Sequence, residues 1–146
     1  MISKRIFDII ISILALLVFL PMNFLIVIVI KLDSKGPVFF QQERVGKDKE
    51  IFNIWKYRTM YFDTDPYAAS PNSDSDKRIT KVGKFLREYS LDEIPQLLNV
   101  IKGDMSIIGP RPMYKEIADK LDALQSRRFN LRPGLTGLAQ INGRTK

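Results

Sequence analysis

The sequence predicts an α/β fold that is mostly α, in which a membrane-associated segment of residues 1–31 precedes a small domain of residues 32–146. Three observations lead to this prediction. A long apolar run opens the chain, two strand-like segments follow it, and helical patterns dominate from Lys81 onward. A chain of 146 residues has room for one compact domain besides the apolar element.

The apolar run, residues 6–30, reads IFDIIISILALLVFLPMNFLIVIVI and carries its one charge at Asp8. As a single helix it would measure roughly 37 Å, enough to cross the hydrocarbon core of a bilayer. Pro21 is expected to break that helix, because proline removes a backbone hydrogen bond. Basic residues flank both ends of the run, and the positive-inside rule places both flanks on the cytoplasmic side. We therefore favour a re-entrant helix-break-helix hairpin over a single span, while a cleaved signal peptide fits least well.

Composition restricts the chemistry that the chain can perform. It contains no histidine and no cysteine, which excludes disulfides, thiolate zinc sites, cysteine nucleophiles and histidine bases. Catalysis would depend on Asp, Glu, Lys, Arg, Tyr or a hard cation bound by oxygen atoms. The formal charge of +7 predicts an anionic partner, which is nucleic acid, a phospholipid headgroup or a phosphorylated substrate. We expect Asp8 to lie at headgroup level and to pair with Lys4 or Arg5.

A short β-hairpin is predicted after the apolar run, from VFFQ at 38–41 and IFNIWKYRTM at 51–60, with a polar turn between them. The Asp-rich segment 61–76 is expected to be an exposed loop. It contains two D-x-D patterns, Asp63/Asp65 and Asp74/Asp76, of the kind that binds a metal and a nucleotide diphosphate in some glycosyltransferases. We interpret them as turn residues and solvated charges, because so short a motif is weak evidence in an Asp-rich loop.

Helices are predicted over VGKFLREY at 82–89, within SLDEIPQLLNVIKGD at 90–104, and over PMYKEIADKLDALQSRRF at 112–129. The last segment has an apolar face at helical spacing, formed by Met113, Ile117, Leu121 and Leu124. The terminal segment RPGLTGLAQINGR, 132–144, is rich in glycine and is expected to be an irregular loop with strand-like pieces.

Asp92 and Glu93 are adjacent carboxylates at the start of the second of these helices. Ser90 and Glu93 have the S-x-x-E spacing of a capping box, so helix capping, metal binding and nucleophilic attack all remain open. A helix that starts one or two residues later would place Pro95 in its first turn, where the missing amide costs nothing, with Asp92 at or beside the cap. Arg111 lies between two prolines, which favours a rigidly placed guanidinium that binds phosphate.

Several stretches together resemble a known family over essentially the whole chain. They are KRIFDII, the apolar hairpin with its proline, KLDSKGPVFFQQERVG, KYRTM, RITKVGKFLREYSLDEIPQLLNVIKGDMSIIGPRP and RPGLTGLAQINGR. In this order they resemble the bacterial sugar transferases of the small, single-domain type. These are monotopic polyprenol-phosphate phosphoglycosyl transferases, which start glycoconjugate assembly.

The resemblance implies a reaction and a location. It implies transfer of a sugar-1-phosphate from a UDP-sugar to polyprenol (undecaprenyl) phosphate with release of UMP, by a ping-pong mechanism through a covalent phosphosugar–aspartate intermediate. Asp92 is the implied nucleophile, and Glu93 is the implied ligand of a Mg²⁺ cofactor. The implied substrate- and phosphate-binding residues are Arg87, Pro110, Arg111, Gln140 and Arg144. The implied location is the bacterial inner membrane, with the catalytic domain facing the cytoplasm.

Elementary chemistry agrees with this expectation. Phosphoryl transfer needs positioning and charge neutralisation more than proton transfer. A carboxylate is ionised at neutral pH and can attack phosphorus without a base, which suits a chain that lacks histidine. Two features depart from the family pattern. Leu20 stands where a serine often precedes the hairpin proline, so that the break relies on Pro21 and Asn23, and the family normally continues past NGR, which leaves open whether the domain is truncated at Lys146.

The competing hypothesis is a membrane-anchored basic module that binds nucleic acid or anionic lipid without catalysis. We disfavour it, and expect no nucleic-acid partner, because the aromatic residues do not alternate with basic ones as in single-strand binders. A rigid Arg–Pro arrangement is also unnecessary for salt-dependent binding to a phosphate backbone. The sequence assigns neither the sugar nor the oligomeric state.

Overall fold

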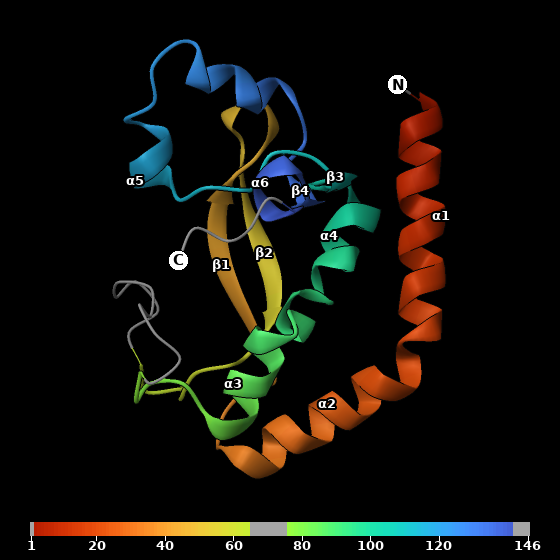
Figure 1. Cartoon of the computed structure of the whole chain (residues 1–146), viewed down its shortest axis with the longest axis vertical. Helices are drawn as coiled ribbons and strands as arrows, with labels where there is room; N and C mark the ends of the chain where they lie inside the picture. Colours follow the sequence, from red (N-terminus) through yellow and green to blue (C-terminus); the bar gives the residue numbers. More distant parts are fainter. Residues whose placement is uncertain (1, 65–75, 142–146) are drawn as a thin grey trace.

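The computed structural model, shown in Figure 1, describes residues 2–64 and 76–141. Two consecutive helices, α1 (Ile2–Val18) and α2 (Leu20–Asp33), form an L along one side of the molecule. The angle of the L encloses a domain built around the antiparallel hairpin of β1 (Phe39–Val45) and β2 (Ile51–Tyr57). The predictions of a mostly helical α/β fold and of a hairpin in this region are therefore confirmed.

The remaining elements surround the hairpin. The longest are α3 (Lys81–Glu88), which agrees with the helix predicted over 82–89, and α4 (Gln96–Lys102). The shorter ones are the 3-10 turns η1 (Lys47–Lys49), η2 (Leu91–Glu93) and η3 (Gln125–Asn130), the strands β3 (Ser106–Ile108) and β4 (Gly134–Thr136), and the helices α5 (Lys115–Ala118) and α6 (Leu138–Ile141).

The break in the apolar run lies where Pro21 predicts it. Helices α1 and α2 meet at Phe19 with a bend of 63°, and Pro21 occupies the first turn of α2, where its missing amide needs no acceptor. Within the described residues, neither helix alone has the length and apolarity to cross a membrane, whereas the bent pair does on those two criteria. The re-entrant arrangement therefore stays a prediction.

The environment of Asp8 differs from the prediction. Its side chain is 3% exposed and accepts hydrogen bonds from Ser106 Oγ at 2.8 Å and from the backbone N–H of Ile107 at 3.1 Å. The expected pairing with Lys4 or Arg5 is wrong, because those two side chains point to other acceptors. A buried carboxylate needs hydrogen-bond donors, and the first two residues of β3 supply them.

Lys4 and Arg5 bind backbone carbonyl groups of the domain. Arg5 donates to the carbonyls of Val100 at 2.5 Å and Ile101 at 2.7 Å, and Lys4 donates to that of Ile108 at 2.9 Å. Carbonyls in the last turn of a helix lack intrahelical partners and carry the negative end of the helix dipole, so a cation is stabilising at the end of α4. Helix α1 is thus attached to the domain by polar side chains on one of its faces.

Helix α2 is attached to the domain through the end of β2. Tyr57 donates its hydroxyl hydrogen to Asn23 Oδ1 at 3.0 Å, and burial raises the pKa of the Tyr57 phenol, which keeps it protonated. The guanidinium of Arg58 donates to the carbonyls of Lys35, Ser34 and Ile30, which end α2. Asn23, expected near the break, therefore bonds to the domain through its side-chain oxygen.

The single helix predicted over 112–129 is wrong. Helix α5 ends at Ala118, and the chain turns before η3 begins. Asp122 accepts a hydrogen bond from the backbone N–H of Gln125 at 2.7 Å, which starts a new turn in place of continuing the helix. Ala118 and Phe129 then pack on Val45 from two separate elements, so the apolar periodicity does not correspond to one helical face.

The terminal segment contains more regular structure than a loop. Strand β4 pairs in parallel with β3, with Ser106 opposite Gly134 and Ile108 opposite Thr136, and α6 follows it. A Cβ on Gly134 would lie 2.1 Å from the backbone nitrogen of Gly109, so the two segments approach as only glycine allows. The prediction of a strand-like piece is thus confirmed at β4, whereas the helix α6 was not predicted. Residues 142–146 lie outside the described part of the chain.

We predict that Asp8→Ala lowers the free energy of unfolding by about 2–3 kcal/mol, because the buried hydroxyl of Ser106 and the partly buried N–H of Ile107 lose their acceptor. Denaturant titration in detergent micelles measures the change. The matched control is Asp119→Ala, an exposed aspartate at the end of α5, for which we expect a change of at most about 0.5 kcal/mol. Equal stability of the two variants would contradict the described role of Asp8.

Candidate active site

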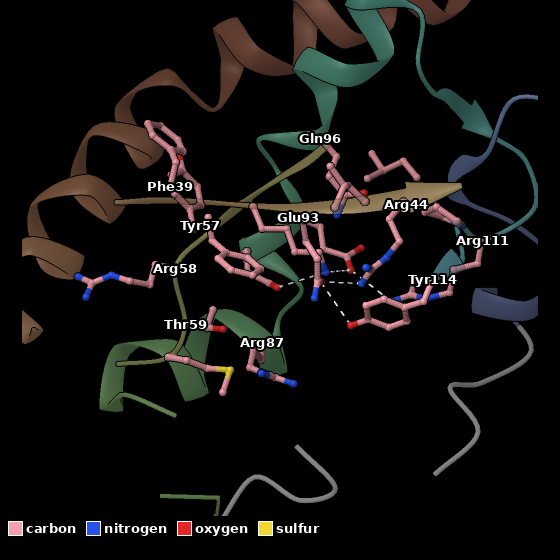
Figure 2. A pocket seen from close by; sticks show the side chains of 18 of the residues that line it. Phe39, Arg44, Tyr57, Arg58, Thr59, Arg87, Glu93, Gln96, Arg111 and Tyr114 are labelled. Atoms are coloured by element: carbon pink, nitrogen blue, oxygen red, sulfur yellow. Dashed lines mark hydrogen bonds and ion pairs between the residues drawn. The ribbon is translucent and has the colours of Figure 1, made fainter. Parts of the chain in front are cut away.

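A cleft of about 930 Å³ lies beside the β-hairpin (Figure 2). Its walls come from β1, β2, α3, η2 and the segment that follows β3. Cationic side chains outnumber carboxylates among the charged residues that line it, which are Arg44, Lys56, Arg58, Arg87, Asp92, Glu93, Arg111 and Arg128. Such a cleft attracts an anion while presenting a carboxylate pair to it.

The two carboxylates lie in the 3-10 turn η2, and no capping box forms there. Ser90 has a φ of 58° and makes no side-chain capping bond, and α4 begins only at Gln96 with Pro95 as its N-cap. The backbone N–H groups of Glu93 and Ile94 bond in the 3-10 pattern to the carbonyls of Ser90 and Leu91, both at 3.2 Å. Pro95 has no amide hydrogen to continue this ladder, so the helix starts after it, later than predicted.

Packing on both sides of the pair directs it toward the cleft. Leu91 and Ile94 both pack against the core cluster that contains Leu86 and Tyr57. Residues three apart share one face of a helical turn, so the two between them point elsewhere. Asp92 is 8% exposed, and both Asp92 and Glu93 line the cleft.

Lys56 and Arg111 hold the carboxylate pair between them. Lys56 Nζ lies 3.1 Å from Glu93 Oε1 and 4.0 Å from Asp92 Oδ2, and the Lys56 side chain is 21% exposed. Arg111 Nη2, from the segment that follows β3, lies 3.5 Å from the same Glu93 oxygen (Figure 2). Partial burial reduces solvent screening, so these cations stabilise two adjacent negative charges better than surface pairs would.

The side chain of Asn99 fixes Lys56 at this distance. Asn99 is 1% exposed; its Oδ1 accepts from the backbone N–H of Trp55 at 2.9 Å, and its Nδ2 donates to the carbonyl of Asn53 at 2.8 Å. Asn99 therefore bonds the edge of β2 to the helix that follows the carboxylate pair. Because Trp55 directly precedes Lys56, the bond between Trp55 and Asn99 also fixes the position of Lys56 relative to the carboxylate pair.

Arg44, Gln42 and Tyr114 form a second polar group in the cleft that the sequence analysis missed. The guanidinium carbon of Arg44 lies 3.5 Å from the centroid of the Tyr114 ring, and Arg44 Nη2 donates to Gln42 Oε1 at 2.7 Å. Burial lowers the pKa of the Arg44 guanidinium, and the neighbouring Tyr114 offsets part of this decrease. Among the described residues, no carboxylate lies within salt-bridge distance of Arg44. The arginine is thus a desolvated cation beside an aromatic face.

Of the predicted phosphate-binding residues, Arg87 and Arg111 line the cleft. Arg87 comes from α3, which approaches β2 so closely that a Cβ on Gly83 would lie 2.0 Å from the carbonyl oxygen of Thr59. Arg111 is held through its carbonyl, which accepts a hydrogen bond from Arg128 Nη2 at 3.0 Å. Arg58 also lines the cleft but points away from Glu93 toward α2, as Figure 2 shows.

The structure gives the other predicted binding residues a different setting. Pro110 and Gln140 are absent from the described lining of the cleft. The carbonyl of Pro110 accepts from the backbone N–H of Gly134 at 2.9 Å, so Pro110 joins β3 to β4. Gln140 lies in α6 after that strand, and Arg144 lies outside the described residues.

The carboxylate pair suits a hard cation that arrives with a phosphate. The described residues contain no group of three or more His, Asp, Cys or Glu side chains with metal-ligand geometry. Mg²⁺ is commonly held by one or two carboxylates together with substrate phosphate oxygens, so Glu93 with Asp92 meets that requirement. The D-x-D patterns give no comparable site: Asp65 and Asp74 lie outside the described residues, and Asp76 pairs with Arg78 at 2.6 Å.

Comparison with known proteins identifies the family. The sequence model described as bacterial sugar transferase matches residues 1–146. The chain is 43% identical, over 98% of its length and 28% of the other protein, to an undecaprenyl-phosphate glucose phosphotransferase of Komagataeibacter xylinus. It is 42% identical to a UDP-N-acetylgalactosamine-undecaprenyl-phosphate N-acetylgalactosaminephosphotransferase of Aeromonas hydrophila, covering 94% of this chain and 33% of that one. It is 40% identical to the exopolysaccharide production protein ExoY of Sinorhizobium fredii, covering 98% and 70%.

The chain spans about a third or less of the first two relatives and most of the third. The match to the family nevertheless covers every residue of the chain, including the carboxylate pair, the proline of the helix break and the Arg111 segment. The chain belongs to the bacterial sugar transferase family.

Proposed function

We propose that the protein is a phosphoglycosyl transferase, which moves a sugar-1-phosphate from a UDP-sugar to polyprenol phosphate and releases UMP. The observation that carries this proposal is the Asp92–Glu93 pair, held between Lys56 and Arg111 in a cation-lined cleft. Relatives from Klebsiella pneumoniae and Escherichia coli, both 43–44% identical, are named UDP-glucose:undecaprenyl-phosphate glucose-1-phosphate transferases. Their names supply the two substrate classes.

In the first half-reaction, a carboxylate oxygen of Asp92 forms a bond to the phosphorus that carries the sugar. The bond between that phosphorus and the oxygen bridging to UMP breaks, and UMP leaves with the electron pair. Asp92 suits this role because it lies in a rigid turn at the wall of the cleft and needs no base at neutral pH.

In the second half-reaction, a phosphate oxygen of polyprenol phosphate attacks the same phosphorus. The Asp92 oxygen leaves as a carboxylate, which restores the enzyme and yields the lipid-linked sugar diphosphate. Nucleophile and acceptor are both anions at neutral pH, so neither step needs a histidine, and the chain has none.

The cations of the cleft would lower the cost of bringing these anions together. Lys56 faces both carboxylates, and Arg87 and Arg111 approach from two other walls. Glu93, with the diphosphate of the substrate, would hold Mg²⁺, which supplies neutralisation of the phosphate charge during transfer. These positions surround the space where a diphosphate would lie against Asp92.

We predict that the purified protein releases UMP from a UDP-sugar in the presence of Mg²⁺ and polyprenol phosphate, and that chelation of the metal stops release. Asp92→Asn should lower kcat by about 10³-fold or more, because the amide cannot attack phosphorus. A UMP-specific assay over a panel of UDP-sugars measures both effects and identifies the sugar. A labelled sugar phosphate should remain on wild-type protein and be absent from Asp92→Asn.

The matched control is Asp119→Asn, which removes one exposed carboxylate outside the cleft and should retain wild-type turnover. Wild-type turnover of Asp92→Asn would contradict its role as nucleophile. Binding to anionic vesicles that weakens with salt, without UMP release under any condition, would favour the basic binding module instead.

We predict that Lys56→Gln lowers kcat/KM for the UDP-sugar at least about 10-fold, because the carboxylate pair then repels the incoming diphosphate. Lys56→Arg should recover part of the loss, since it restores the charge. Lys84→Gln, an exposed lysine of α3, removes the same charge from the surface and should leave kcat/KM nearly unchanged. Equal loss in Lys56→Gln and Lys84→Gln would show that only net charge matters.

The proposed location is the bacterial inner membrane, with α1 and α2 as a re-entrant hairpin and the domain on the cytoplasmic side. Both ends of the hairpin bond to the same domain, through Arg5 at one end and Arg58 at the other. This double attachment supports a hairpin whose ends share one side of the bilayer.

We predict that an impermeant thiol reagent modifies Ser3→Cys and Ser34→Cys from the same side of sealed membrane vesicles. The chain has no native cysteine, so each label reports one position. Ala123→Cys, exposed on the domain, marks the domain side. Labelling of the first two positions from opposite sides would show that the segment spans the bilayer.

A further inference from the structure

A second cavity, of about 400 Å³, lies in the angle between the two N-terminal helices and the domain. We call it the elbow groove. Its hairpin wall consists of Leu16, Leu20, Asn23, Phe24 and Val27, and its domain wall consists of Phe39, Tyr57, Ile94, Pro95 and Leu98. The side chains are apolar apart from Asn23 and the Tyr57 hydroxyl, and those two polar groups bond to each other at 3.0 Å. The groove therefore presents an apolar surface.

The elbow groove adjoins the cleft that contains the carboxylate pair. Phe39 and Tyr57 line both cavities, and their rings stack with centroids 5.5 Å apart and an interplanar angle of 22°. Ile94 and Pro95, on the groove wall, directly follow Asp92 and Glu93 in the chain. An apolar surface and a cation-lined anion site thus meet at one aromatic pair.

Leu98 is an apolar residue of the domain wall whose side chain stays exposed in the folded protein. It is 46% exposed, whereas its neighbours on α4, Leu97 and Val100, are buried in the domain. On the opposite wall, Leu20 is 59% and Phe24 66% exposed. An apolar chain lying between these walls would cover all three side chains.

We propose that the elbow groove binds the isoprenoid chain nearest the phosphate of the polyprenol phosphate acceptor, and that this phosphate passes Phe39 and Tyr57 to reach the cleft. The inference rests on the proposed function and names the acceptor subsite. A molecule that occupies both sites must be apolar along its length and anionic at one end, because an apolar groove adjoins a cationic cleft. Polyprenol phosphate has that chemistry, and undecaprenyl phosphate appears in the names of the relatives.

The test separates the acceptor from the donor. Leu98→Gln places a polar amide in the domain wall of the groove without changing charge or the hairpin helices. We expect KM for undecaprenyl phosphate to rise about 10-fold, because an unpaired amide against the isoprenoid chain is unfavourable. KM for the UDP-sugar should change less than twofold. The control is Leu131→Gln, a leucine 52% exposed that lines neither cavity, for which both KM values should equal those of the wild type.

Chain length provides a second measurement. The wild type should prefer undecaprenyl phosphate to the phosphate of a two-isoprene alcohol, and Leu98→Gln should lose most of that preference. An unchanged acceptor KM in Leu98→Gln, or an equal rise in both KM values, would overturn the proposal. Competition by added phospholipid that disappears in Leu98→Gln would also overturn it, since it would make a membrane phospholipid the occupant. Failure of the proposed function itself would instead show as absent UMP release by the wild type.

Discussion

The last residues of β2 are the constraint on which the remaining geometry depends. Three residues that end β2, together with Arg58 after them, bind three other parts of the molecule. Trp55 bonds to Asn99 of α4 and Lys56 to Glu93 of η2. Tyr57 bonds to Asn23 of α2, and Arg58 bonds to carbonyls at and just beyond the end of α2. Alternating residues of a strand point to opposite faces, so a strand end can reach several elements at once. A shift of this strand by one residue would move Lys56 away from the carboxylate pair. The same shift would break the hydrogen bonds that attach α2 to the domain.

This arrangement gives the site its chemical character. The carboxylates come from a turn that proline keeps short, and their charge is matched by a strand lysine and by an arginine on a segment held to β4. The carboxylate pair, the lysine and the arginine thus come from three different parts of the chain, and neither cation is adjacent in sequence to the carboxylate that it contacts. Preorganisation of this kind stabilises transferring charge without reorganisation during the reaction. The family relationship and the site geometry therefore both support the proposed reaction class.

Local signals in the sequence were sufficient for part of this structure. Pro21 predicted the break, and alternation predicted the hairpin. Local signals left the role of the Asp92–Glu93 pair open, and the family resemblance assigned it to the site; in the structure both residues line the cleft. Long-range pairing was not predictable, because Lys56 and Arg44 look like solvated strand residues until η2 and Tyr114 are placed beside them. The prediction of one helix over 112–129 was wrong for a related reason. The apolar residues of this segment contact the β-hairpin from two separate elements, and the spacing of apolar residues in the sequence does not reveal this.

Asp8 imposes an order on biosynthesis. Its donors, Ser106 and Ile107, lie 98 and 99 residues further along the chain. At about 5–20 residues per second, the ribosome takes roughly 5–20 s to make the strand that these donors belong to. During that interval the Asp8 carboxyl group lacks its two donors from β3. In the proposed re-entrant arrangement, α1 would then stay near the bilayer surface until the domain has folded, because a carboxyl group without donors is unfavourable in hydrocarbon.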